Sequence, residues 1–177
     1  MAETATLEQY VVDGANSSLG FTARTTLHPV HGKGDGMSGS AAIAWDASGA
    51  PLADPAPAMH LELPVERLRT GNALQDGQTA KWLDSRRFPT LAADLRELGP
   101  GSAPGRYLAS GEITLVGRSR RYQGELAIVR EDTRLTVSGQ LTVDVRDFGL
   151  QPPKVLMLKV EPTVAVELRM VATRKDG

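Results

Sequence analysis

Two of the three histidines, His28 and His31, lie within four residues of each other, and a neutral imidazole is the commonest metal ligand in proteins. The proline and valine between them favour extended backbone, on which the two side chains point to opposite faces. The third histidine, His60, alternates with the apolar residues that follow it and is expected to face solvent. We therefore predict surface histidines at the end of a strand and no metal site.

Two carboxylates, Asp144 and Asp147, flank Val145 and Arg146, a spacing that could seat a paired general acid and base. An exposed strand face, on which the acids pair with arginine, accounts for the same spacing, and we favour this structural interpretation because such pairs are common. A nucleophile is also missing, since the chain contains no cysteine and no Gly-x-Ser-x-Gly motif joins a strand to a helix. The sequence therefore predicts a protein that is not an enzyme.

Two segments could bind phosphate. The run Gly-Lys-Gly-Asp-Gly at residues 32–36 lacks the Gly-Lys-Ser/Thr order of a phosphate-binding loop and opens no helix. A basic cluster of Arg118, Arg120 and Arg121 follows a turn glycine and could hold a phosphate head group at the mouth of a barrel. A solvated turn is the commoner explanation of such a cluster.

Composition excludes several classes of partner. The 177 residues are 41% hydrophobic, and 20 basic residues against 21 acidic ones give a net charge of −1, which provides no field for nucleic acid. No uncharged apolar run is long enough to span a bilayer, so we predict no integral membrane insertion. We expect one domain over residues 1–177, cytoplasmic as the chain is given, and periplasmic or secreted if a signal segment has been removed.

Short alternating segments, separated by 18 glycines and 11 prolines, predict a chain built almost entirely of strands. The clearest is residues 155–172, where seven apolar side chains from Leu156 to Met170 share one parity and charged residues share the other. Pro162 lies on the apolar parity and lacks an N–H group, so we expect a bulge there, near an edge of the sheet.

Eight further segments continue this period of two or extend it. They are residues 9–12 as an edge extension, 19–27, 41–45, 59–65, 91–98, 106–116, 122–130 and 135–145. This gives about eight strands, the number whose closed antiparallel barrel holds one small ligand. Residues 73–87 have helical spacing and precede Pro89, which predicts a short helical crossover at a barrel opening. Residues 32–39 and 47–57, rich in Gly, Pro, Ala and Asp, are expected to be surface loops.

The interior of such a barrel has two interpretations. Leucine, valine, alanine and methionine could form a packed core. Small inward residues such as Ala23, Ala41 and Gly139 could instead leave an apolar void, which is a place for an apolar ligand.

Several motifs, taken in order, resemble the YceI family of polyisoprenoid-binding proteins. They are Tyr10-Val11-Val12-Asp13, Thr70-Gly71-Asn72, Trp82-Leu83-Asp84, Phe88-Pro89-Thr90, the run from Gly111 to Gly117, and Asp147-Phe148-Gly149-Leu150. The resemblance runs almost end to end. It implies an all-β, lipocalin-like barrel whose interior holds a long isoprenoid, either free, phosphorylated or as a quinone tail, with no cofactor required.

The parity of the strands, read with this resemblance, predicts the residues that line or close the cavity. They are Phe21, Trp45, Leu61, Leu63, Trp82, Phe88, Leu115, Phe148 and Leu158, with Arg67 or the turn from Arg118 to Arg121 near any polar head. Two other functions remain open: an interaction module with a filled core, and a barrel that modifies a bound lipid. A homodimer is a further prediction, because a long edge strand at residues 155–172 would invite pairing.

Overall fold

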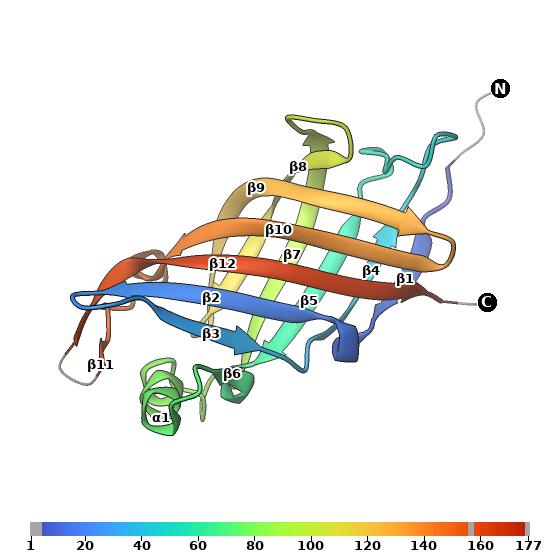
Figure 1. Ribbon diagram of the computed structural model, residues 1–177. Coiled ribbons are helices and arrows are strands. Elements are labelled where there is room, and N and C mark those ends of the chain that lie inside the picture. The colour runs from blue at the N-terminus through green and yellow to red at the C-terminus, as the bar shows by residue number, and fades with distance from the viewer. Residues whose placement is uncertain (1–4, 156–157, 176–177) are drawn as a thin grey trace.

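Alternating side chains fold this chain into an antiparallel β-barrel with one α-helix, in agreement with the predicted all-β class (Figure 1). The structure, a computed structural model, describes residues 5–155 and 158–175. The strands are β1 (Glu8–Val12), β2 (Ser18–Thr25), β3 (Val30–Gly34), β4 (Ser38–Ile43), β5 (Ala58–Pro64), β6 (Leu68–Arg69), β7 (Thr90–Pro100), β8 (Arg106–Leu115), β9 (Arg118–Glu131), β10 (Arg134–Asp144), β11 (Lys154–Val155) and β12 (Leu158–Arg174). The helices are α1 (Ala73–Trp82) and the 3₁₀ turns η1 (Gly14–Asn16), η2 (Val65–Arg67) and η3 (Val145–Phe148).

Eight strands form the closed ring, in the order β1-β4-β5-β7-β8-β9-β10-β12, and β12 pairs back with β1. The predicted number of strands is therefore confirmed. Beyond the ring, β2, β3 and β6 extend the sheet from β12. Three long strands are thus each divided in two: β1 from β2 by η1, β3 from β4 by residues 35–37, and β5 from β6 by η2.

The last strand differs from its prediction at one end and in its neighbours. β12 begins at Leu158, while β11 is a separate short strand that pairs with it, and Leu156 lies outside the described residues. β12 pairs with β10 on one side and with β1 and β2 on the other, so it is not an edge strand. The reason for proposing a homodimer through this edge is thereby removed. The predicted bulge is present, because the ladder with β2 shifts register between Val160 and Val164, on either side of Pro162.

Residues 32–39 are mostly strand, where the sequence predicts a loop. β3 occupies residues 30–34 and pairs with both β2 and β6. Its glycines make room for side chains inside the barrel: a Cβ at Gly32 would overlap the Phe21 ring, and one at Gly34 would lie 2.7 Å from Leu63 Cδ2. Glycine therefore marks dense packing at these two positions.

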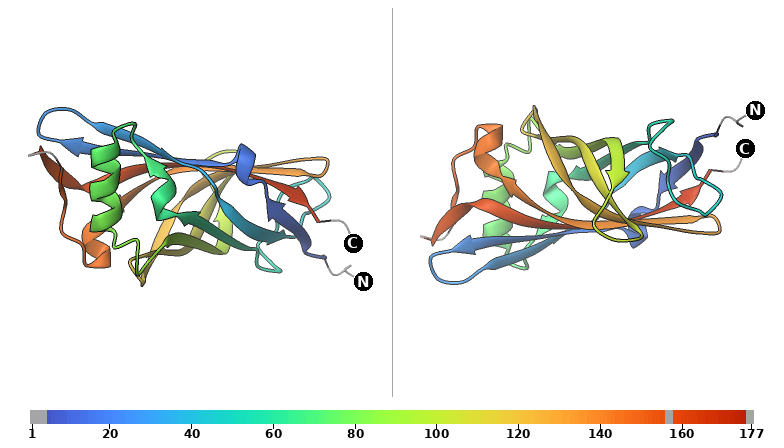
Figure 2. Two further views of the ribbon diagram at one scale, coloured as in Figure 1. Left: turned by 90° about the horizontal axis from the view of Figure 1, so that it is seen from below. Right: turned by 90° about the horizontal axis from the view of Figure 1, so that it is seen from above.

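The helix α1 lies at one end of the barrel, and β1 lies with the end of β12 at the other (Figures 1 and 2). Asn72 caps α1, since its Oδ1 accepts hydrogen bonds from the backbone N–H groups of Leu74 and Gln75 at 3.0 and 3.2 Å. The helix ends at Trp82 and Asp84 adopts a left-handed φ of 51°, so the predicted crossover at 73–87 is helical only in its first ten residues. No helix among the described residues is long and apolar enough to cross a membrane.

Candidate functional site

The barrel is filled with side chains at the end that carries β1. There Tyr10, Ile43, Leu135, Val137 and Met170 are each 1% exposed or less. We call this half, defined by these five residues, the closed end. Its packing density leaves no room for a ligand.

A polar and aromatic cluster completes the closed end. Tyr10 donates a hydrogen bond from its hydroxyl to Glu8 Oε2 at 2.6 Å and accepts one from Trp45 Nε1 at 3.1 Å. The Arg130 guanidinium lies 4.8 Å from the centre of the Trp45 ring and forms an ion pair with Glu8 at 3.3 Å. Burial and the hydrogen bond to Glu8 raise the pKa of Tyr10 to about 12, so its hydroxyl stays protonated as the donor.

The other half of the barrel is hollow. Val164, Val166 and Leu168 have the same parity on β12 as the buried Met170, yet they remain partly exposed and line a cavity of about 370 Å³. Other lining residues are Leu19, Phe21, Leu61, Leu91, Leu95, Ile113, Leu126 and Leu141, from β2, β5, β7, β8, β9 and β10. We call this space the apolar cavity. Apolar side chains that point inward but stay accessible are the structural mark of a binding site for an apolar molecule.

The helix α1 and the segment before it line one end of the apolar cavity with Thr70, Gln75, Thr79, Trp82 and Leu83. The backbone N–H and the hydroxyl of Thr70 both donate to Asp76 Oδ1, each at 2.8 Å, which ties α1 to the segment that follows β6. Trp82 Nε1 donates to the backbone oxygen of Gln151 at 2.8 Å and so joins α1 to the loop after η3. We call this end the mouth of the cavity. Its lining includes the polar side chains of Thr70, Gln75 and Thr79.

Five of the ten predicted binding residues line the apolar cavity. They are Phe21, Leu61, Leu63, Trp82 and Leu115. Their contact with a ligand stays a prediction, but the structure brings them together around one space.

The other five lie elsewhere in the described part of the chain. Trp45 belongs to the closed end, and Phe148 is 1% exposed and stacks on Tyr122 with ring centres 6.0 Å apart. Phe88 packs beside Gly117 with the Arg87 guanidinium 5.2 Å from its ring centre. Arg67 is outside the barrel, where its Nε donates to Asp35 Oδ1 at 2.7 Å, and Leu158, at the start of β12, is half-buried away from the lining. Parity gives the face of a strand but not the position along the barrel axis, which is why Trp45 falls at the closed end. Arg67 and Phe148 lie in 3₁₀ turns, where the parity of a strand does not apply.

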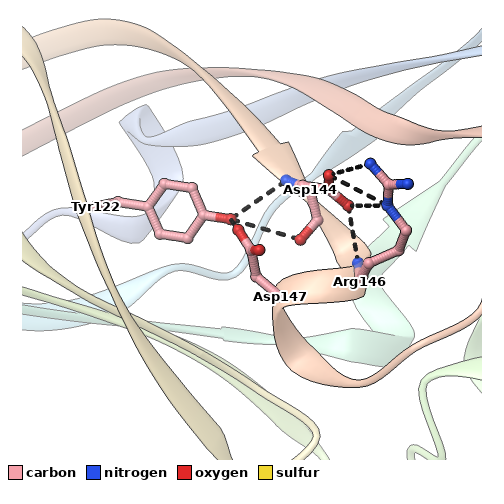
Figure 3. Close-up of polar contacts among 4 residues, drawn as sticks. All are labelled: Tyr122, Asp144, Arg146 and Asp147. Carbon is pink, nitrogen blue, oxygen red and sulfur yellow. Dashed lines mark hydrogen bonds and ion pairs between the residues drawn. The ribbon is translucent and has the colours of Figure 1, made fainter.

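The carboxylates Asp144 and Asp147 belong to a cluster at η3 (Figure 3). The Asp144 carboxylate accepts from the Arg146 guanidinium at 2.7 and 3.0 Å and from the Arg146 backbone N–H at 2.9 Å. Tyr122, which lines the cavity, donates its hydroxyl to Asp147 Oδ2 at 2.6 Å and accepts from the Asp144 backbone N–H at 3.2 Å. The acids therefore cap η3 and attach it to β9.

The protonation of this cluster also suits a structural role. The hydrogen bond from Arg146 lowers the pKa of the Asp144 carboxyl below its usual value. Burial, together with the hydrogen bond to Asp147, raises the pKa of Tyr122 to about 12. At neutral pH the aspartate stays ionised and the tyrosine neutral, so neither is poised to exchange a proton.

Sequence reasoning did not single out Tyr122, Thr70, Gln75 or Thr79 as lining residues. For Tyr122 a signal existed, since it shares its parity on β9 with Leu126 and Ile128. For the three mouth residues there was none, because the docking angle of a short polar helix is not encoded in its periodicity.

The chain matches one family model and resembles several solved structures. The family model of the YceI-like domain matches residues 10–172. The crystal structure of BcnA from Burkholderia cenocepacia is similar, with a TM-score of 0.76 and 19% identity, covering 92% of this chain and 99% of BcnA. A polyisoprenoid-binding domain from Saccharophagus degradans, implicated in plant cell wall breakdown, has a TM-score of 0.73 and 17% identity, covering 94% and 98%.

A YceI protein from Campylobacter jejuni is more distant, with a TM-score of 0.60 and 11% identity over 84% of this chain and 86% of that one. No curated protein matches this chain. At these identities the likeness to solved structures shows a shared fold.

Proposed function

This chain belongs to the YceI-like family, and on that premise we propose that it is a non-catalytic carrier of a long isoprenoid-type lipid. The ligand is a polyprenyl chain, a polyprenyl phosphate or the isoprenoid tail of a quinone. A binding role is supported by the family and by the polyisoprenoid-binding domain among its structural neighbours. Apolar lipid is the only partner that the proposal requires.

The observation that carries the proposal is the contrast in exposure along β12. Val164, Val166 and Leu168 point inward but stay accessible, whereas Met170 on the same face is fully buried. Leaving apolar surface accessible forgoes about 25 cal/mol per Å² of stabilisation. A bound apolar molecule would recover that free energy by covering the same side chains.

The size of the cavity limits how the lipid is held. At about 370 Å³ it lies near the lower end of the roughly 300–1,000 Å³ range of pockets that hold drug-sized ligands. It therefore suits a segment of a long isoprenoid, and the remainder of the chain would leave through the mouth beside α1. Such a site discriminates weakly between chain lengths, because each additional methylene that protrudes contributes little.

The two tryptophans of the chain allow a direct test, because Trp82 lines the cavity mouth and Trp45 lies at the closed end. The variant Trp45→Phe reports on Trp82 alone, and Trp82→Phe reports on Trp45 alone. On titration with a polyprenol in detergent-free buffer, we expect a saturable change in Trp82 emission and none in Trp45 emission. Equal changes at both sites, or no change at either, would overturn the proposal.

Native mass spectrometry of the protein purified from its own host complements this titration. Organic extraction of the bound fraction should release an isoprenoid that is absent from a mock purification. A bare protein that also fails to bind polyprenol would favour an interaction module instead.

A further inference from the structure

A second, polar pocket of about 590 Å³ lies on the outside of the barrel, at the place where three strands are divided. It is lined by Lys33 in β3, Asp35 just after β3, Arg67 in η2, Arg69 in β6, Arg169 in β12 and residues 15–18 around η1. We call it the outer basic pocket. The run at residues 32–36 and Arg67 were considered above as possible phosphate contacts, but the proposed carrier function does not use this pocket.

The sheet register explains how the cations gather there. Lys33 pairs with Arg69 across β3 and β6, and Arg169 pairs with Ser18 across β12 and β2. Between these two pairs β2 contributes only small residues, Ser18 and Gly20, so a hollow remains with basic side chains on both sides.

The charge of the pocket is unbalanced. Four cations face one carboxylate, Asp35, which leaves an excess of three positive charges. Arg67 forms the one ion pair there, with Asp35, and the ion pairs of the described residues involve neither Lys33, Arg69 nor Arg169. Glu167, the nearest other acid on β12, stands opposite Gly20 and is not part of the lining. Counting it still leaves two positive charges in excess.

The arginines of the pocket also lower the pKa of its one lining carboxylate, Asp35. The hydrogen bond from Arg67, with the nearby charge of Arg69, holds the pKa of the Asp35 carboxyl below its usual value. Like charges held together in one pocket repel each other and are relieved when an anion binds. Three arginines supply forked N–H donors that match phosphate oxygens, and a lysine adds a mobile positive charge.

The outer basic pocket is separate from the apolar cavity. Leu19 and Leu68 line the cavity, while their chain neighbours Ser18 and Arg69 line the pocket, because alternate side chains of a strand point to opposite faces. A ligand in the pocket therefore does not need to enter the barrel.

We propose that the outer basic pocket binds a phosphate-bearing anion on the exterior of the barrel. Cations on both sides of the hollow suit a group with several phosphate oxygens, such as pyrophosphate or a phosphorylated head group. Binding rests on exposed charges, since the side chains of Arg67 and Asp35 are 47% and 58% exposed, so it weakens as salt is added. The proposal holds whether or not the cavity carries an isoprenoid.

Two probes distinguish the source of the phosphate. Isothermal titration with pyrophosphate at low ionic strength tests free phosphorylated compounds. Co-sedimentation with phosphatidylglycerol vesicles, against phosphatidylcholine vesicles, tests a lipid head group. Saturable binding in either assay supports the site and identifies its source.

The variant R69Q/R169Q removes one cation from each side of the pocket and breaks none of the ion pairs described above. Its matched control, R96Q/R134Q, removes the same charge from β7 and β10, outside the pocket, and neither arginine takes part in an ion pair of the described residues. We expect R69Q/R169Q to weaken binding roughly ten-fold or more and the control to change it less than about two-fold. Thermal melting and polyprenol titration of both variants establish that they are folded.

Two results would overturn the proposal. One is the absence of saturable binding of either probe to the parent protein at low salt. The other is an equal loss in R69Q/R169Q and R96Q/R134Q, which would reduce the effect to net charge.

Discussion

The two ends of this barrel share strands such as β10 and β12 and the same kinds of apolar side chain, yet one is solid and the other hollow. On β10, Leu135 is fully buried at the closed end, while Leu141, with the same parity six residues later, lines the apolar cavity. The difference lies in what each side chain meets across the barrel. At the closed end Tyr10 and Trp45 pack against each other in the interior, whereas at the other end the aromatic side chains, among them Phe21 and Trp82, lie in the lining and leave the space between them open.

The largest expected effect is on stability, from a pair of identical substitutions on β10. We expect Leu135→Ala to lower the free energy of unfolding by about 2–5 kcal/mol, because it opens a void in a packed region. Leu141→Ala should cost about 1 kcal/mol, since Leu141 already borders free space. Urea unfolding measures both. Equal losses would mean that the cavity is not empty space in the folded protein.

The opposite substitution sharpens the comparison, because adding volume should harm the closed end and be tolerated in the cavity. Ala41→Phe at the closed end, where Ala41 is 2% exposed, should destabilise by about 1–3 kcal/mol or more. Ala93→Phe, which points into the cavity, should leave the melting temperature nearly unchanged and weaken polyprenol binding about ten-fold or more. An Ala93→Phe variant that binds polyprenol like the parent would argue against the cavity as the binding site.

The smallest effects concern pH, and they differ in sign between the closed end and the cavity wall. At the closed end, the hydrogen bond from Tyr10, with the charges of Arg130 and Arg174, lowers the pKa of Glu8. Its contribution is therefore complete above the usual glutamate pKa and is lost as pH falls through the lowered value. We expect about 0.2–1 kcal/mol, given its partial exposure.

On the cavity wall, His60 contacts Asp94 at 2.7 Å and Glu62 at 3.1 Å on the outer face of β5, and these hydrogen bonds raise its pKa. Its contribution is complete below the usual histidine pKa and is lost as pH rises through the raised value. With 44% of the side chain exposed, the expected size is again about 0.2–1 kcal/mol. Melting curves from acidic to mildly basic pH, with Glu8→Gln and His60→Gln as controls, separate the two slopes, and identical slopes in parent and variants would contradict this assignment.

Much of this fold could be predicted from side-chain alternation and a few motifs. The barrel of eight strands, the bulge at Pro162, the helical crossover and the family are all confirmed. Position along the barrel axis was not predictable, so Trp45 was grouped with Phe21 although it lies at the closed end, and Phe148 lies in the 3₁₀ turn η3, which alternation does not reveal.

Glycine was the other source of error. Gly32 and Gly34 read as loop residues but lie in a strand, under the side chains of Phe21 and Leu63. Of the small residues that were expected to leave space, Ala23 and Gly139 line the cavity, whereas Ala41 is buried at the closed end. Even at Gly139 a Cβ would lie 2.7 Å from Cδ2 of Leu126, its partner on β9, so a missing side chain indicates room only when the residue on the paired strand is known.

The three divided strands have a consequence for how the molecule opens. The hydrogen-bonded ladders are interrupted at the same position along the barrel by η1, residues 35–37 and η2. As a result, β2, β3 and β6 form a panel whose hydrogen bonds are separate from those of β1 and β4. This panel can fray as a local cooperative unit while the ring through β1 and β12 stays closed. Amide hydrogen exchange would then be faster in the panel than in the ring, and the wall of the apolar cavity that carries Leu19, Val30 and Leu68 would be its least protected part.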